Sequence, residues 1–212
     1  MMEAIVNNHS ISQMYLFFAR CFSYPEREFY EVVKGREAQK ELDAIVKGLP
    51  FEMNFKGIPS PSLPREEFEG EYVNALDMAG GRPLYESAYT SYRDDMCSKD
   101  IYEDILRFYE HFNVRLNERE KDYPDHLAAE LEFMFFLSKK EIDAKEQGKD
   151  AEPYHLAQMD FLERHLSKWV HKLDERIQKK IKEPFYKEAS AFMVEFLKGH
   201  QLHLQNMLRK LN

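Results

Sequence analysis

Histidine and carboxylate pairs at helical spacing are the residues of this sequence that could bind a metal ion. A di-iron or di-manganese helical bundle needs a Glu from each of two helices and a Glu-x-x-His pair from each of two others. The chain contains one such pair, Glu152 with His155. Two further pairs lack a third ligand at a recognisable spacing: His126 with Glu130, and His200 with His203. We therefore expect no metal and interpret these histidines as surface residues, with a metal-dependent helical enzyme as the alternative.

Other kinds of catalytic site leave no pattern in the sequence. There is no G-x-S-x-G nucleophile turn, no Gly-rich phosphate loop and no Rossmann fingerprint. The adjacent carboxylates Glu103 and Asp104 are typical of an acidic surface, as are Asp94 and Asp95. We therefore expect a protein that is not an enzyme and needs no cofactor.

The stretch YPDHLAAELEFM, residues 123–134, opens a strongly apolar segment with a histidine near its start. Helix initiation explains most of it: Asp122 as N-cap, Pro124 in the first turn, and Asp125 near the positive end of the helix dipole. His126 remains unexplained, because an imidazolium is disfavoured at a helix N-terminus. A neutral ring would offer one donor and one acceptor beside Asp125. A structural role and a binding role both remain open for it.

Charge and composition restrict the class of partner. The net charge is −8, and residues 1–106 carry all of it, with 11 Lys and Arg against 19 Asp and Glu. A cationic partner is therefore favoured over nucleic acid, which requires Lys and Arg against its phosphates. The start lacks a secretion signal and the apolar runs are too short to span a bilayer. We expect a cytoplasmic protein with no stable membrane insertion.

Apolar periodicity predicts an all-α fold. With 16 Phe, 12 Tyr and 10 Met against 8 Gly, the composition favours packed helices. Spacing of three and four residues places helices at 10–22 (capped by Ser10), 26–49 (interrupted at Gly35), 65–79, 98–112 (capped by Ser98), 123–146, 153–177 and 184–198, and at a tail after Gly199. We expect a single domain over residues 1–212, a bundle of about eight to ten helices with loops near 48–64, 80–98 and 145–152.

Several separate segments, in a fixed order, resemble the TorD/DmsD-type redox-enzyme maturation chaperones. The helix ending in Tyr-Pro, the Tyr-containing helix with its Gly-rich turn and Pro-x-Tyr-x-Ser stretch, the Pro-Asp-His signature and two closing helices all have counterparts there. These segments are ARCFSYPEREFY (19–30), EFEGEYVNALDMAGGRPLYESAY (67–89), YPDHLAAELEFM (123–134), QMDFLERHLSKWV (158–170) and PFYKEASAFMVEFL (184–197). The resemblance implies an all-helical cytoplasmic chaperone.

The resemblance also implies a binding site and a partner. Asp125 and His126 would lie at the mouth of a groove for a twin-arginine leader, whose guanidinium groups pair well with carboxylates. Four residues could line an aromatic trough for the apolar part of the leader, with core packing as the alternative: Tyr72, Leu76, Tyr85 and Tyr89. Tyr123, Pro124 and Glu130 complete the candidate set.

The function implied is binding alone. The chaperone would bind the leader of a molybdopterin oxidoreductase catalytic subunit. It would hold this subunit in its apo-form until the molybdenum or tungsten cofactor is inserted. The alternative is a chaperone of the same fold that grips its client without a leader. Either a monomer or a homodimer is compatible with the sequence.

Overall fold

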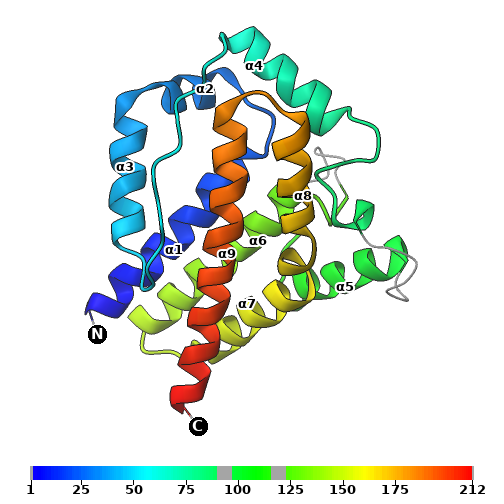
Figure 1. Ribbon diagram of the computed structural model, residues 1–212. Helices are drawn as coiled ribbons and strands as arrows, with labels where there is room; N and C mark the ends of the chain where they lie inside the picture. The colour runs from blue at the N-terminus through cyan, green and yellow to red at the C-terminus, as the bar shows by residue number, and fades with distance from the viewer. Residues whose placement is uncertain (1, 90–96, 116–122, 212) are drawn as a thin grey trace.

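The computed structural model describes residues 2–89, 97–115 and 123–211, and this part of the chain is built from helices (Figure 1). Nine α-helices occur within these ranges, which confirms the all-α prediction. The same ranges contain no strand, apart from an isolated β-bridge between Tyr85 and His126. The α-helices are α1 (Met2–Cys21), α2 (Arg27–Lys34), α3 (Arg36–Lys47), α4 (Arg65–Tyr72), α5 (Ser98–His111), α6 (Leu127–Glu146), α7 (Glu152–Arg164), α8 (Leu166–Lys180) and α9 (Pro184–Leu211). Two short elements, η1 (Val73–Asp77, a π-turn) and η2 (Glu86–Ala88, 3-10), connect α4 to α5.

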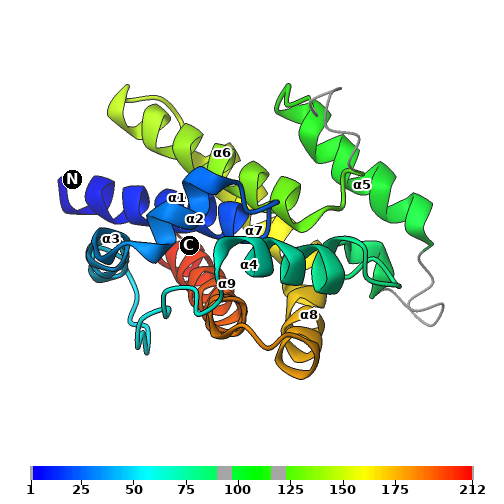
Figure 2. The same ribbon diagram turned by 90° about the horizontal axis from the view of Figure 1, so that it is seen from above.

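Helices α1, α6 and α9 form the centre of the bundle. α1 packs along α6 more extensively than any other pair, and from above it lies between α6 and α9 (Figure 2). The core is rich in aromatic rings because the inward faces of these helices carry Phe and Tyr in part of their length, such as Tyr15, Phe133 and Phe192. Tyr15, Phe18 and Phe196 are fully buried where α1 meets α9. Such a centre fixes the position of α6, the helix that follows the Pro-Asp-His stretch.

Two predicted helix boundaries are wrong for reasons of packing. The structure splits the predicted helix 153–177 at His165, whose backbone leaves the helical region with φ −120° and ψ −95°. By contrast, α9 runs through Gly199 without a break. The Phe51 ring lies 2.7 Å from where a Cβ of Gly199 would stand, so glycine here admits a neighbouring ring and does not end the helix.

Helix starts also differ from prediction. α1 begins at Met2, so Ser10 lies within a helix and does not cap one. α5 is capped by Cys97, one residue before the predicted Ser98, and the Cys97 N–H donates to Asp100 Oδ2 at 2.8 Å. Gly35 does separate α2 from α3 as predicted. Within the described residues, no helix is both long and apolar enough to cross a bilayer.

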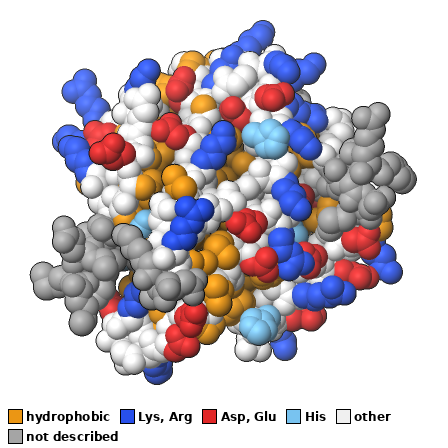
Figure 3. Space-filling model, turned by 60° about the horizontal axis from the view of Figure 1, so that its bottom comes forward, with side chains coloured by type: hydrophobic (Ala, Val, Ile, Leu, Met, Phe, Trp, Pro, Cys, Tyr) orange, Lys and Arg blue, Asp and Glu red, His pale blue; other side chains and the backbone are white. Residues whose placement is uncertain are grey.

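The molecular surface mixes charge with apolar patches. On the face in Figure 3, hydrophobic side chains gather between Lys, Arg, Asp and Glu side chains. Among the large apolar side chains with the greatest exposure are Met78 (78%), Val32 (58%) and Tyr24 (53%). Val32 and Tyr24 line a large cleft that also reaches His126.

Candidate functional site

The Pro-Asp-His stretch is a turn, closed by the His126 N–H donating to Tyr123 O at 3.1 Å, and it lies against residues 84–89. Tyr85 and His126 pair as in an antiparallel sheet, and the Leu127 N–H donates to Leu84 O at 2.8 Å. The Glu86 N–H donates to Asp125 O at 3.0 Å. These hydrogen bonds occupy backbone groups of Asp125 and Leu127 that would belong to the first turn of a helix starting at residue 123. The helix therefore begins at Leu127, and the prediction that Pro124 lies in its first turn is wrong; Asp122, the predicted cap, lies outside the described residues.

His126 is the N-cap of α6. Its Nδ1 accepts a hydrogen bond from the Ala128 N–H at 3.2 Å, which requires that nitrogen to be unprotonated. The ring packs edge-on against Tyr85, with the ring centroids 4.9 Å apart. The same side chain lines the large cleft. A cap and a cleft wall thus account for the histidine that helix initiation left unexplained.

Asp125 lies beneath this segment and is fully buried. Its Oδ2 accepts from the Ser87 N–H at 3.0 Å, which joins the turn to η2. Its Oδ1 has no hydrogen-bond partner among the described residues. Pro124 is also buried, and its carbonyl accepts from the Tyr109 hydroxyl at 3.1 Å. In this conformation Asp125 positions the turn and is not exposed to an incoming guanidinium.

Tyr123 and Tyr85 form the exposed side of the segment. The Arg82 guanidinium lies between their rings, with Cζ 3.9 Å from the Tyr85 centroid and 4.4 Å from that of Tyr123. Tyr102 stacks behind Tyr123 at 5.4 Å. Tyr123 is 49% exposed and stands at 79° to Tyr85, so an aromatic surface beside His126, partly covered by Arg82, borders the solvent.

A cleft of about 940 Å³ opens on the other side of His126. It runs between α2, the C-terminal end of α1, η1, the end of α5 and the first half of α6. Its apolar lining includes Tyr24, Phe29, Val32, Val114, Phe133 and Phe136. A volume of this size is at the upper end of the range for small-molecule pockets and can accommodate part of a peptide.

The charged residues of the cleft are mostly acidic. Four carboxylates line it against two guanidinium groups: Glu26, Glu28, Asp77 and Glu132 against Arg20 and Arg115. All six side chains belong to exposed residues at the rim. An apolar floor with an acidic rim matches a ligand that combines positive charge with an apolar segment.

Glu130 is buried one turn into α6, behind the Pro-Asp-His segment. The Trp169 Nε1–H donates to its Oε2 at 3.3 Å, while its Oε1 has no hydrogen-bond partner among the described residues. Burial, with added repulsion from Glu86 and Asp125, raises the pKa of Glu130 well above its usual value. Glu130 is therefore a buried acid that favours its protonated form and lies out of a ligand's reach.

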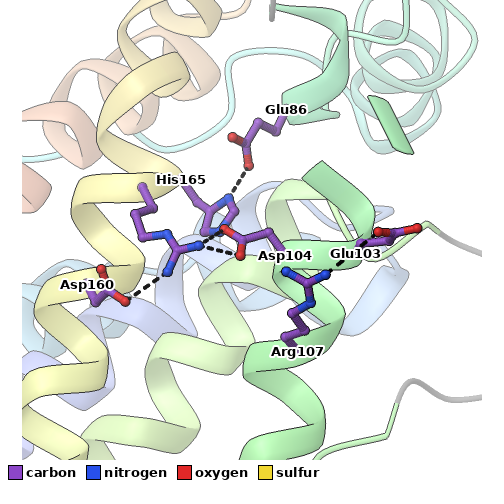
Figure 4. Close-up of polar contacts among 7 residues, drawn as sticks. Glu86, Glu103, Asp104, Arg107, Asp160 and His165 are labelled. Atoms are coloured by element: carbon purple, nitrogen blue, oxygen red, sulfur yellow. Dashed lines mark hydrogen bonds and ion pairs between the residues drawn. The ribbon is translucent and has the colours of Figure 1, made fainter. Parts of the chain in front are cut away.

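Glu86, one of the carboxylates that raise the pKa of Glu130, lies against a histidine at the junction of α7 and α8, and Figure 4 shows this contact. His165 Nδ1 lies 2.9 Å from Glu86 Oε2, and its Nε2 lies 3.3 Å from Asp104 Oδ2. Arg164 also pairs with Asp104, from the neighbouring position in the chain. The break between α7 and α8 thus places both ring nitrogens against carboxylates. Asp104 is consequently part of an ion-pair network, which corrects its interpretation as ordinary acidic surface; Asp94 and Asp95 lie outside the described residues.

Three of the predicted trough residues are packed inward. Tyr72 and Leu76 are buried, and the Tyr72 hydroxyl donates to Phe22 O at 3.0 Å, although the Tyr72 side chain also lines the cleft. Tyr89 is half-buried and stacks on Trp169 at 5.4 Å. Burial raises the pKa of Tyr89 to about 12. The structure thus brings Tyr72 and His126 to the cleft, and Tyr85 and Tyr123 to the aromatic surface beside it.

Sequence analysis missed the carboxylates and rings from other segments that complete the cleft. Glu26 and Phe29 come from the α2 region, Asp77 from η1, and Glu132 from α6. One signal was present: α6 is apolar on most of its sides, yet carries the exposed Glu132 between buried Leu131 and Phe133. A charge inside such a stretch marks the side that other helices leave uncovered.

The prediction that the candidate metal-binding histidines are surface residues is wrong for three of them. His126 is 9% exposed, His155 5% and His200 1%. Burial, with repulsion from His203, lowers the pKa of His200 to about 3, and its Nδ1 lies 2.7 Å from the Tyr15 hydroxyl. His155 lies beside Glu141 and Leu204 O. Within the described ranges, no three His, Cys, Asp or Glu residues are grouped so as to hold a metal ion.

Comparison with known proteins gives matches over nearly the whole chain. The family described as nitrate reductase delta subunit matches residues 36–175. The selenate reductase assembly chaperone protein of Thauera selenatis is 31% identical over 204 residues, which cover 96% of this chain and 94% of the relative. The chlorate reductase assembly chaperone protein of Ideonella dechloratans is 31% identical, with 99% and 97% covered. The chaperone protein TorD of Vibrio parahaemolyticus is 29% identical over 104 residues, 48% of this chain and 47% of the relative.

Proposed function

The chain belongs to the nitrate reductase delta subunit family, which includes the TorD-like redox-enzyme maturation chaperones, and from this premise we propose its client and its mode of binding. The protein is an assembly chaperone for a reductase-type enzyme, as its relatives over the full length are named. We propose that the client is the apo-form of a molybdenum or tungsten oxidoreductase catalytic subunit. The chaperone holds it in the cytoplasm until cofactor insertion, by binding its twin-arginine leader.

The observation that carries the leader-binding proposal is the acidic, apolar-floored cleft. A twin-arginine leader presents two guanidinium groups followed by an apolar segment. Carboxylates bind guanidinium groups in a bidentate manner, and aromatic side chains bury apolar segments. In the cleft, Asp77 and Glu132 could pair with the guanidinium groups. Phe133 and Phe136 could cover the apolar segment.

The predicted site residues divide into two roles within this proposal. His126 and Tyr72 contact the leader from the cleft wall, and Tyr85 and Tyr123 contact it from the adjacent aromatic surface. Asp125 and Pro124 act indirectly, because they are buried and hold the turn that positions His126. Glu130 and Leu76 are buried and Tyr89 stacks on Trp169, so the proposal assigns these three residues no contact with the leader.

Binding without chemistry is the mechanism we propose. An unstructured leader loses conformational entropy when it docks, so the affinity is moderate and the leader can be released for export. We further propose that residues 1–212 act as one unit.

The test is a titration of the purified protein with a twin-arginine leader peptide and with its Lys-Lys variant. Lysine cannot reproduce the planar, bidentate geometry of arginine, so the Lys-Lys peptide should bind several-fold more weakly. Glu132→Gln and Asp77→Asn should each weaken binding of the arginine peptide. Glu188→Gln is the matched control, because Glu188 is an exposed glutamate that does not line the cleft.

A second candidate is a chaperone of the same fold that grips its client without any leader, and the matched family, described by a subunit of nitrate reductase, is compatible with it. Capture of a client catalytic subunit from which the leader has been deleted separates the two functions. Equal capture of the client with and without its leader, together with no binding of the leader peptide, would support the leader-independent function.

A further inference from the structure

The Arg82 side chain occupies an aromatic site beside the cleft. Its Cζ lies 3.9 Å from the Tyr85 ring centroid and 4.4 Å from the Tyr123 centroid, so one guanidinium group contacts two ring faces. Guanidinium groups are favoured between aromatic rings because the cation meets the negative face of each ring and the planar group can stack. The two rings stand at 79° to each other with their centroids 6.3 Å apart, so they form an aromatic corner in which a cation faces both rings and a planar group can stack on one of them.

The backbone at Arg82 holds the side chain in this site. Arg82 has φ +45°, a left-handed conformation that is uncommon for a residue with a Cβ, and it follows Gly81 at φ +87°. Arg176 Nη2 donates to Gly80 O at 2.7 Å, and the Tyr85 N–H donates to Arg82 O at 3.2 Å. The turn thus directs the Arg82 side chain back over Tyr85 at some conformational cost.

The aromatic site shares a wall with the cleft. The Tyr85 ring packs against His126, which lines the cleft, and Tyr123 is stacked on Tyr102. Arg82 is itself exposed, and Tyr123 is 49% exposed. A second guanidinium group could therefore reach the rings from solvent once Arg82 moves away. A peptide in the cleft would need to extend only past His126.

We propose that the Tyr85–Tyr123 site binds one arginine of the client leader and that Arg82 occupies the site until the leader displaces it. This inference rests on the proposed function, since it names the subsite for one of the two arginines. The other arginine pairs with the carboxylates of the cleft. Arg82 is an internal competitor, so binding exchanges one guanidinium group for another on the same rings.

The exchange has two consequences. The aromatic site adds little net binding free energy, because the leader arginine contacts the same two rings that Arg82 leaves, and this keeps binding reversible. Lysine competes poorly with Arg82 for two ring faces, because its ammonium group is compact and strongly hydrated. The aromatic site would thus discriminate twin arginine from twin lysine beyond what the acidic rim achieves.

The test uses Arg82→Gln with Arg107→Gln as its matched control. Both substitutions remove one positive charge, and Arg107 is an exposed residue on α5 that lies 3.9 Å from Glu103. Arg82→Gln should bind the twin-arginine peptide about two- to five-fold more tightly than Arg107→Gln does, the range that loss of one exposed cation–π competitor gives. The Lys-Lys peptide should show no such difference. Circular dichroism and thermal unfolding verify that each variant is folded.

Adding Tyr123→Leu to Arg82→Gln should abolish the increase in affinity, because the vacated site then lacks one ring. Equal affinities of Arg82→Gln and Arg107→Gln for the twin-arginine peptide, or a weaker affinity of Arg82→Gln, would overturn the subsite while leaving the leader-binding function intact.

A small probe separates failure of the subsite from failure of the proposed function. N-acetyl-arginine amide should shift the Tyr85 and Tyr123 ring signals in NMR spectra of Arg82→Gln, and do so less in the wild type at the same concentration. If these shifts occur but neither protein binds the leader peptide, the site for a planar cation stands and the leader-binding function fails. Absence of the shifts in Arg82→Gln would overturn the subsite.

Discussion

Two buried glutamates on α6, Glu130 and Glu141, have opposite environments. Glu130 receives one hydrogen bond, from Trp169, and faces Glu86 and Asp125, so the pKa of its carboxyl group is raised well above the usual value, first by burial and then by these two carboxylates. Glu141 accepts hydrogen bonds from Lys145 and Gln158 and lies 3.8 Å from His155 Nδ1. Burial would raise the pKa of Glu141, but these partners together lower it to about 2.

Within the proposed function, this difference distinguishes a structural end of α6 from the end that borders the proposed leader site. At Glu141 the polar groups of α6, α7 and α9 satisfy one another, as expected where a buried charge only has to be stable. At Glu130 the neighbouring carboxyl groups of Glu86 and Asp125 and the burial of the side chain favour its protonated form, and this acid lies directly behind the turn that carries His126. Uncompensated buried acids reduce stability, and proteins retain such groups most often at functional sites.

The largest expected effect is at the structural end. Glu141→Ala leaves Lys145, Gln158 and His155 without their acceptor and should lower the free energy of unfolding by about 2–4 kcal/mol. Chemical denaturation at neutral pH measures it, and affinity for the leader peptide should stay unchanged. A large loss of peptide affinity in a folded Glu141→Ala protein would show that the two ends are not separate.

The low pKa of Glu141 also predicts that the unfolding free energy decreases at acid pH. Because the folded pKa of about 2 lies below the ordinary value near 4.5, the stabilisation is complete above pH 5 or so and is lost as the pH falls toward about 2. The unfolding free energy of Glu141→Gln should depend less on pH over this window than that of the wild type.

Asp125 should give the next largest effect. Asp125→Ala removes the acceptor of the Ser87 N–H and should cost about 1–3 kcal/mol of unfolding free energy, because that donor becomes unsatisfied. Leader affinity should fall as well, since the turn carrying His126 is released. Asp125→Asn keeps an acceptor oxygen and should retain both properties, whereas a loss of leader affinity in Asp125→Asn alone would indicate direct pairing of the carboxylate with the leader.

Substitutions of His126 should have smaller effects, and they should separate the role of the residue in stability from its role in leader binding. His126→Ala removes the N-cap of α6 and should lower the unfolding free energy by about 1 kcal/mol, whereas His126→Asn supplies a good cap and should not. Both variants lose the ring between the cleft and Tyr85, so both should bind the leader peptide more weakly. If only His126→Ala bound more weakly, the histidine would act through the helix start alone.

The smallest effect should be an increase in stability at Glu130. Glu130→Gln can keep the hydrogen bond from Trp169 and removes the ionisable acid, so at pH 7 the unfolding free energy should rise by about 1 kcal/mol. The raised pKa means that the unfolded chain releases this proton first, so the wild type loses stability as the pH rises above the ordinary value of the group. Glu130→Gln should flatten that slope, and a destabilised Glu130→Gln would contradict the contrast between the two glutamates.

The sequence alone determined the bodies of the helices and the irregular segments between them, and it drew attention to the Pro-Asp-His stretch. Apolar spacing of three and four residues located the bodies of all the helices, and Gly35 correctly marked the boundary between α2 and α3. These features are local: they depend on the period of the helix and on residues that cannot continue one. The acidic excess of the first half is also a property of composition, and it reappears at the rim of the cleft as Glu26, Glu28 and Asp77.

Only the tertiary structure decided where helices begin and end and which residues share the site. α6 starts at Leu127 because the Leu84 carbonyl accepts from the Leu127 N–H across 43 positions of the chain, and the Glu86 N–H donates to the Asp125 carbonyl across 39 positions. His165 interrupts a periodic segment to reach Glu86 and Asp104, and Gly199 continues a helix because Phe51 fills its space. Arg82 lies between Tyr85 and Tyr123 for the same kind of reason. Each outcome depends on contacts between distant residues, and helical period carries no information about them.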